Sequence, residues 1–171
     1  MTIPPLTLRI REIRSVISTD DIIPGRYKHM YTDTRQLAKH VFENLLPGFA
    51  ETLREGDVLC STETFGIGSS REQAVSSLQA AGVKAVVAPR FGRIFFRNAW
   101  NLGLLAIEAD LAAAREGESL TLDLRAGTLA GPFGTVRFPP PPPDMIAMVA
   151  EGGLLARVQR RLREASARAV A

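Results

Sequence analysis

The feature that most constrains the fold is an alternation of apolar strands and short amphipathic helices in the middle of the chain. Residues 83–88 form a run that is apolar except for Lys84, which is typical of a strand covered on both faces. A helix is predicted before it over about 70–81, and Gly82 ends that helix. Further short strands are predicted at 58–61 and 104–107, with an amphipathic helix at 93–102. This β-α-β-α-β order predicts an α/β layered core.

The segment before this core mixes regular and irregular structure. Residues 6–13 alternate apolar and polar side chains and predict a strand. The segment 18–25 is too rich in turn formers for regular structure, and a loop is expected over 26–32. A helix is then predicted to open at Asp33 and to be broken by the Pro47-Gly48 pair. Its apolar stripe is Leu37, Val41, Phe42 and Leu45.

The last third of the chain changes pattern. Residues 119–124 and 135–138 alternate apolar and polar side chains around turn formers, which predicts antiparallel strands. The prolines at 139–143 form a short spacer. A helix capped by Asp144 is expected to run to residue 150, and a final arginine-rich helix is expected over 154–167.

Composition narrows the function classes. The 171 residues contain no internal repeat, are 46% hydrophobic and 23% charged, and predict a single globular domain over 1–171. The net charge of +3 is too small to indicate nucleic-acid binding. No apolar stretch approaches the roughly 20 residues of a membrane span. The N-terminus lacks the pattern of a signal peptide, so we expect a cytoplasmic protein without membrane or nucleic-acid partners.

The cysteine and histidine content argues against a resident metal. Cys60 is the only cysteine, whereas an iron–sulfur cluster needs about three or four cysteine ligands. The 2 histidines do not provide a zinc site by themselves. We therefore expect no metal in this chain, and we expect Cys60 to lie in the core.

The stretch Gly66-Ile67-Gly68-Ser69-Ser70-Arg71 carries the chemical signal. It predicts a strand, a glycine loop and the start of a helix, where free backbone N–H groups and the helix dipole attract anions. Arg71 adds a planar guanidinium that suits a carboxylate. A structural alternative is that Ser69 or Ser70 simply caps the helix, with an acidic or amide residue three positions later. The spacing by itself leaves both interpretations open. The loop does not match a nucleotide P-loop or a dinucleotide fingerprint.

Several segments resemble one known family in order and at its spacing. Residues 66–72 resemble the glycine-x-glycine-serine-serine-arginine-glutamate signature of the swivelling domain of the aconitase superfamily. Residues 19–27 resemble the Thr-Asp-x-Ile-Ile-Pro-Gly-Arg-Tyr segment of 3-isopropylmalate dehydratase small subunits, and 37–43, 81–88 and 91–98 also fit them. The resemblance implies a single swivelling β/β/α domain of the aconitase C-terminal type. This sequence departs from the usual pattern at Ile67, Gln73 and Pro89-Arg90.

The resemblance also implies roles for particular residues. Ser69 would be the catalytic base, acting as an alkoxide that removes a proton alpha to a carboxylate. Gly68, Ser70 and Arg71 would bind the substrate. The loop Tyr27, Lys28, His29 and Met30 falls where family members select the variable side group of the substrate. The alternative for that loop is a polar segment ordered only by a partner subunit.

The function implied is that of the small subunit of a heteromeric hydro-lyase. It would isomerise 2-isopropylmalate and 3-isopropylmalate by dehydration and rehydration in leucine biosynthesis, together with a large subunit that carries a [4Fe-4S] cluster. One alternative is the small subunit of a homoaconitase or another substituted-malate dehydratase, acting on a related di- or tricarboxylate. An alternative of a different class is a noncatalytic carboxylate-binding module that regulates a partner.

Overall fold

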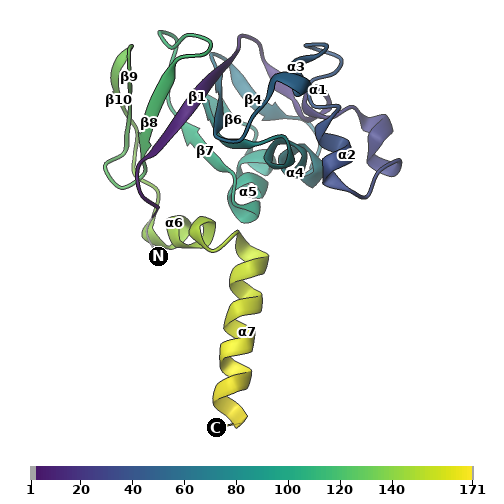
Figure 1. Cartoon of the computed structure of the whole chain (residues 1–171), viewed down its shortest axis with the longest axis vertical. Coiled ribbons are helices and arrows are strands. Elements are labelled where there is room, and N and C mark those ends of the chain that lie inside the picture. Colours follow the sequence, from purple (N-terminus) through teal and green to yellow (C-terminus); the bar gives the residue numbers. More distant parts are fainter. Residues whose placement is uncertain (1–2, 171) are drawn as a thin grey trace.

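A seven-stranded mixed sheet forms the body of the protein (Figure 1). The computed structural model describes residues 3–170. The strand order is β10-β9-β8-β1-β3-β5-β7. Its parallel part comprises β1 (Leu6–Ile13), β3 (Asp57–Ser61), β5 (Val83–Ala88) and β7 (Leu105–Glu108). Ile10 pairs in register with Val58. Because β3 is buried along its whole length and β5 nearly so, the expectation of an α/β layered core is confirmed.

The antiparallel part of the sheet extends from the other edge of β1. It consists of β8 (Ser119–Asp123), β9 (Thr128–Gly131) and β10 (Gly134–Arg137). The sequence predicted two strands here and missed β9. This strand is only 4 residues long and ends in a glycine, so it carries too little alternation to be recognised.

A second, three-stranded parallel sheet carries the glycine loop. Its order is β2 (Ile17–Ser18), β4 (Thr64–Ile67) and β6 (Arg90–Phe91). Phe65 of β4 pairs with both outer strands and is fully buried. The small sheet thereby fixes the position of the residues that follow β4.

The helices are α1 (Thr19–Ile22), α2 (Thr34–Ala38), α3 (Phe49–Thr52), α4 (Glu72–Ala80), α5 (Arg93–Leu102), α6 (Pro143–Ala150) and α7 (Leu154–Val170), with a 3-10 helix at Gly25–His29. Helix α5 contacts α4, β4, β7, α6 and α7. Figure 1 shows α7 extending away from the body, with the C-terminus at its far end.

Two expectations for the N-terminal half are wrong. The segment 18–25 contains the helical turn α1 (Thr19–Ile22), because Ser18 and Asp21 form a capping box. The Asp21 N–H donates to Ser18 Oγ at 3.1 Å, and the Ser18 N–H donates to Asp21 Oδ2 at 2.7 Å. The helix that opens at Asp33 ends already at Ala38. Phe42 adopts φ +58° and donates its N–H to the Ile22 carbonyl at 2.9 Å, so tertiary contacts replace the expected helical turns.

Two helix starts also differ from expectation. Helix α6 begins at Pro143 with no side-chain cap, and the Asp144 carboxylate instead lies 3.3 Å from the Arg157 guanidinium. Helix α4 begins at Glu72 rather than at Ser70. The residues between β4 and α4 therefore form a longer open loop than the sequence predicts.

Candidate active site

The loop between β4 and α4, residues 68–71, is the serine loop. Ser69 and Ser70 are exposed, and Arg71 occupies the N-cap position of α4 with no side-chain cap hydrogen bond. The interpretation of either serine as a helix cap is therefore wrong. Both hydroxyls stand clear of the helix end and remain available to a ligand.

Glycines at 66 and 92 let α5 pack directly against the end of β4, which leads into this loop. Gly66 has φ +78°, and a Cβ there would lie 2.3 Å from Phe95 Cγ. A Cβ on Gly92 would lie 2.1 Å from the Gly66 carbonyl oxygen. In the same strand, the Phe65 carbonyl oxygen accepts a hydrogen bond from the Gly92 N–H at 2.9 Å. Contacts below 3 Å cannot be relieved by small shifts when the partner is backbone. The end of β4 is thus held rigidly against the start of α5.

Thr19 completes the surroundings of Ser69. The Thr19 and Ser69 hydroxyl oxygens lie 3.3 Å apart, and Thr19 itself is 1% exposed at the start of α1. A Cβ on Gly68 would lie 3.3 Å from Thr19 Oγ1, and the φ of Gly68 is +101°, which glycine adopts most readily. Sequence reasoning missed Thr19. The only signal for it was the resemblance of residues 19–27, which did not indicate contact with Ser69.

Arg71 reaches across to the same helix. Its guanidinium Nη1 forms an ion pair with Asp20 and donates to the Ile23 carbonyl at 3.2 Å. The Arg71 side chain is 17% exposed, whereas that of Asp20 is 62% exposed. A Cβ on Gly25 would lie 3.2 Å from Arg71 Nη2, so a glycine keeps the far side of the guanidinium uncrowded. The Arg71 guanidinium is therefore already paired at Nη1, whereas Nε and Nη2 make no hydrogen bond among the described residues.

The residues 27–30 do not act as one unit. Tyr27 is buried: its ring stacks on His40 at 3.9 Å between centroids, and its hydroxyl donates to the Glu43 carboxylate at 2.9 Å. Hydrogen bonds from His40, from Tyr27 and from Arg26 lower the pKa of Glu43. Tyr27 is therefore part of the framework of this segment.

His29 and Met30 follow Tyr27 and are exposed, Met30 by 61%. Their side chains form no hydrogen bond or ion pair with the serine loop within residues 3–170. The side chain of Lys28 lies outside the described residues. The chain fold brings Thr19, Asp20 and Arg71 to Ser69, but it does not bring these two side chains into contact with it.

A groove of about 370 Å³ lies next in sequence to both regions, lined by residues that follow 27–30 and residues that follow the serine loop. It lies where α2 packs against α4, and it is lined by Tyr31, Thr32, Thr34, Leu37, Glu72, Gln73 and Ser76. Three of these residues come from the first turns of α4, directly after the serine loop. The groove was not predicted, because its two walls are about 40 residues apart in the sequence.

Cys60 lies inside β3 and is 4% exposed, which confirms its expected core position. Burial, together with Glu12 and Glu116, raises the pKa of its thiol to about 12. Within residues 3–170 there is no group of three or more histidine, cysteine and carboxylate side chains that could hold a metal ion. No helix in that part of the chain is long and apolar enough to cross a membrane.

The structure combines an α/β layered body with an exposed serine beside a paired arginine at a helix start. Comparison with known proteins assigns the chain to a protein family. The family described as the aconitase C-terminal domain matches residues 14–111, and the chain belongs to this family.

Individual relatives are more specific. The chain is 42% identical to the 3-isopropylmalate dehydratase small subunit 2 of Archaeoglobus fulgidus over 146 residues, which cover 84% of this chain and 88% of the relative. It is 37% identical to the homoaconitase small subunit of Thermus thermophilus, over 86% of this chain and 91% of the relative. The crystal structure of 3-isopropylmalate dehydratase from Methanocaldococcus jannaschii superposes with a TM-score of 0.89 at 34% identity, covering 96% of this chain and 99% of the other. The fold expected from the resemblance is confirmed.

Proposed function

We propose that this chain, as one swivelling domain over 1–171, is the small subunit of a cytoplasmic heteromeric hydro-lyase. The enzyme interconverts 2-isopropylmalate and 3-isopropylmalate by dehydration and rehydration in leucine biosynthesis. The observation that carries the proposal is the exposed Ser69 hydroxyl, 3.3 Å from the buried Thr19 hydroxyl and two residues before Arg71. The similarity to 3-isopropylmalate dehydratase small subunits supports the choice of substrate.

Ser69 is the proposed general base. It accepts the proton from the carbon alpha to a substrate carboxylate while the C–H electron pair forms the double bond and the hydroxyl group departs. A serine hydroxyl is almost fully protonated near neutral pH, and each unit by which its pKa falls requires about 1.4 kcal/mol. Three features of this chain supply part of this stabilisation of the alkoxide. They are the Thr19 hydroxyl as a donor, the free N–H groups at the start of α4, and the charge of Arg71.

Arg71 is the proposed carboxylate binder. Its Nη1 is held by Asp20 and by the Ile23 carbonyl, which orients the guanidinium plane. Nε and Nη2 then remain for a substrate carboxylate, and a guanidinium can present these two donors in parallel. Gly68 and Ser70 are proposed to contact the same carboxylate through the backbone N–H and the hydroxyl.

The departing hydroxyl needs a Lewis acid, which a [4Fe-4S] cluster with an open iron supplies. The residues of this chain do not fit such a group, because its single cysteine is buried in β3. We therefore place the cluster on a large-subunit partner. We propose no nucleic-acid or membrane partner.

Lys28, His29 and Met30 are the proposed contacts for the variable group of the substrate. Their support is the exposure of His29 and Met30 at the end of a 3-10 helix that the buried Tyr27 anchors. An apolar Met30 fits an isopropyl group, whereas His29 fits a carboxylate. The alternative substrate is therefore the tricarboxylate of a homoaconitase, and Tyr27 is a positioning residue in either case.

The test is to reconstitute the chain with its large subunit and to compare Ser69→Ala with Ser119→Ala. Ser119 is an exposed serine on β8 and serves as the matched control. We expect Ser69→Ala to assemble normally and to lose turnover by at least about a thousandfold, and Ser119→Ala to keep full activity. Turnover retained in Ser69→Ala would refute the base assignment and leave a noncatalytic carboxylate-binding module. Higher activity on homoaconitate than on isopropylmalate would show that the enzyme is a homoaconitase.

A further inference from the structure

The last helix, α7, carries an apolar stripe that the described part of the chain leaves uncovered. Its members recur with the alternating spacing of three and four that is typical of helix–helix contacts, at Leu155, Val158, Leu162 and Ala165. Leu155 is 71% exposed and Leu162 is 63% exposed, although a contiguous apolar patch is normally an interaction site. Residues 161–167 are all exposed, and Figure 1 shows this part of α7 standing clear of the body.

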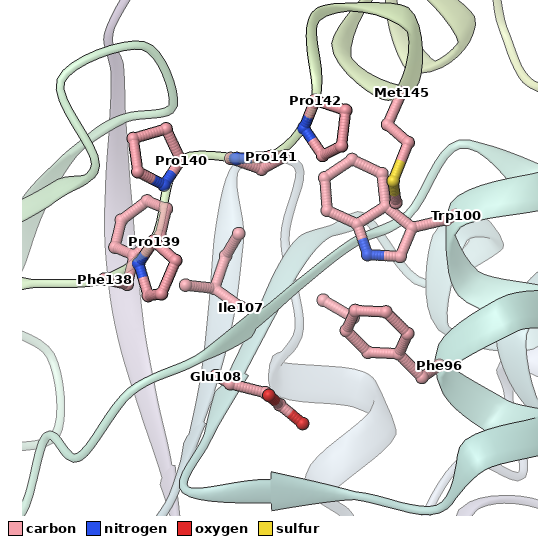
Figure 2. Close-up of a pocket in the computed structure, with 11 residues that line it drawn as sticks. Phe96, Trp100, Ile107, Glu108, Phe138, Pro139, Pro140, Pro141, Pro142 and Met145 are labelled. Carbon is pink, nitrogen blue, oxygen red and sulfur yellow. The ribbon is translucent and has the colours of Figure 1, made fainter.

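The base of α7 is nevertheless held firmly. Helix α6, which precedes it, is seated on the body, because Pro142 and Met145 lie beside the Trp100 ring of α5 (Figure 2). The turn between α6 and α7 also packs closely on the end of α5. Gly153 has φ +99°, and a Cβ there would lie 2.6 Å from the Asn101 carbonyl oxygen. The turn therefore has little freedom to reorient α7.

A buried carboxylate fixes the direction of α7 further. The side chain of Glu151 is 7% exposed and lies 2.8 Å from Arg160 Nη2 and 3.7 Å from Arg157 Nε. Arg157 in turn donates to the Asp144 carbonyl oxygen of α6 at 2.7 Å. Burying a carboxylate is costly unless cations pair with it, so these contacts hold α7 at one angle to α6. The exposed half of the helix is thus presented in a preset orientation.

The stripe continues into a hollow of about 340 Å³ between α6 and α7. Met145 and Met148 line the hollow from α6, and Leu154 and Val158 line it from α7. Methionine side chains adapt to the shape of an inserted apolar group. We call the stripe and the hollow together the α7 docking face.

One border of the α7 docking face is cationic. Of the 21 basic and 18 acidic side chains of the chain, residues 154–170 hold 5 arginines and 1 glutamate, which leaves 16 basic and 17 acidic side chains for residues 1–153. Arg161 lines the hollow. Neither Arg161 nor Arg163 takes part in an ion pair within residues 3–170. Cations beside an apolar seam favour an occupant that carries carboxylates.

A second copy of this chain does not meet that requirement. Two α7 helices side by side would bring arginines against arginines, and residues 1–153 are nearly neutral. The seam also spans only about two heptads, fewer than the three or four that indicate a coiled coil. A membrane surface fits less well, because α7 lacks the aromatic residues that interfacial helices commonly present. The occupant that fits is an acidic protein surface with an apolar ridge.

We propose that the α7 docking face binds the large subunit, on a surface where aspartate and glutamate side chains flank an apolar ridge. The inference rests on the proposed function, which supplies this partner. In the complex, Leu155 and Leu162 become buried, Arg161 pairs with a carboxylate of the partner, and an apolar side chain enters the hollow. The docking face shares no residue with the serine loop, so it determines affinity for the partner.

The first test compares two aspartate substitutions in α7 of the full chain. Leu162→Asp places a charge in the stripe, whereas Ala167→Asp places the same charge about 140° round the helix, on an exposed position. The dissociation constant of the complex with the large subunit is measured by calorimetry, and circular dichroism of each variant records its helix content. We expect Leu162→Asp to weaken binding at least about tenfold and Ala167→Asp to stay within about threefold of the parent. Leu162→Asp should also need more small subunit for half-maximal turnover.

The second test addresses the charge of the partner. Arg161→Glu should weaken binding at least about tenfold at low salt and by less at high salt, because salt screens exposed charges. Arg125→Glu makes the same change in net charge at an exposed position between β8 and β9, and it should leave the dissociation constant within about twofold. Because Arg161 is exposed, this variant keeps the test decisive even if Leu162→Asp unfolds α7.

Four results would overturn the proposal. An unchanged dissociation constant in Leu162→Asp, or an equal loss in Ala167→Asp, would show that the stripe does not meet the large subunit. Self-association of the chain alone that Leu162→Asp abolishes would assign the face to a second copy. Binding to phosphatidylglycerol vesicles that Leu162→Asp abolishes would assign it to a membrane. A parent complex that assembles through this face without isopropylmalate turnover would instead refute the proposed function and support the docking.

Discussion

The hydroxyl of Thr19 offers a sharp test of the proposed base, because valine has the same shape and lacks the oxygen. If Ser69 reacts as an alkoxide, Thr19 must donate to it. A hydrogen bond to a charged group contributes about 1.5–3 kcal/mol, or about 10- to 150-fold in rate. The two oxygens lie 3.3 Å apart, beyond the usual range of about 2.5–3.0 Å for two oxygens. We therefore expect the lower end, a loss of about tenfold in kcat for Thr19→Val.

The assay is steady-state turnover of the reconstituted complex with isopropylmalate, with a thermal melt of each variant alone. KM should change little, because Thr19 is buried and does not line the open face of the loop. The melting temperature should also change little, since Ser69 is exposed and water can replace its partner. Thr19→Ser is the matched control and should retain most of kcat. A kcat of Thr19→Val within twofold of the parent, or an equal loss in Thr19→Ser, would refute the donation.

Three further outcomes are expected from the structure. Gly66→Ala should lower the free energy of unfolding by about 2–5 kcal/mol, because φ is positive and the new Cβ would overlap Phe95. Gly134→Ala, which has a positive φ but open space, should lower it by only about 1–2 kcal/mol. Equal urea midpoints of the two variants would contradict this. Burial raises the pKa of Asp57, but hydrogen bonds from its arginine and backbone partners outweigh burial and leave this pKa lowered. The ionised Asp57 therefore stabilises the fold above the unfolded pKa of about 3.9, and this stabilisation is lost as the pH falls through the lower folded pKa. The stability difference between the parent and Asp57→Asn, from chemical denaturation, should thus shrink on acidification, and a growing difference would be inconsistent with the ion pairs. Cys60, with a pKa of about 12 inside β3, should resist alkylation in the native chain at neutral pH and react once the chain is unfolded; rapid native labelling would place it elsewhere.

The sequence predicted the strands β1, β3, β5 and β7 and the helices α4 and α5 close to their observed bounds. These elements have apolar runs, a clear alternation or a clear helical stripe, and glycines mark the helix ends. The position of Ser69 in a glycine loop before α4 was also readable, because such loops depend on local backbone requirements. Local pattern sufficed wherever a segment's own side chains decide its conformation.

Tertiary contact decided the rest. The helix after Asp33 stops at Ala38 because Phe42 bonds to the Ile22 carbonyl, and no pattern within 33–45 contains that information. The pairing of Arg71 with Asp20 joins residues 51 positions apart.

The chain by itself thus determined a buried parallel core and a serine pair in a glycine loop before a helix, because apolar periodicity and glycine placement are local properties. Only the folded structure decided which side chains surround that serine. Those surroundings depend on which distant segments the packing of α1 and α5 brings together, and short-range propensity does not encode such contacts.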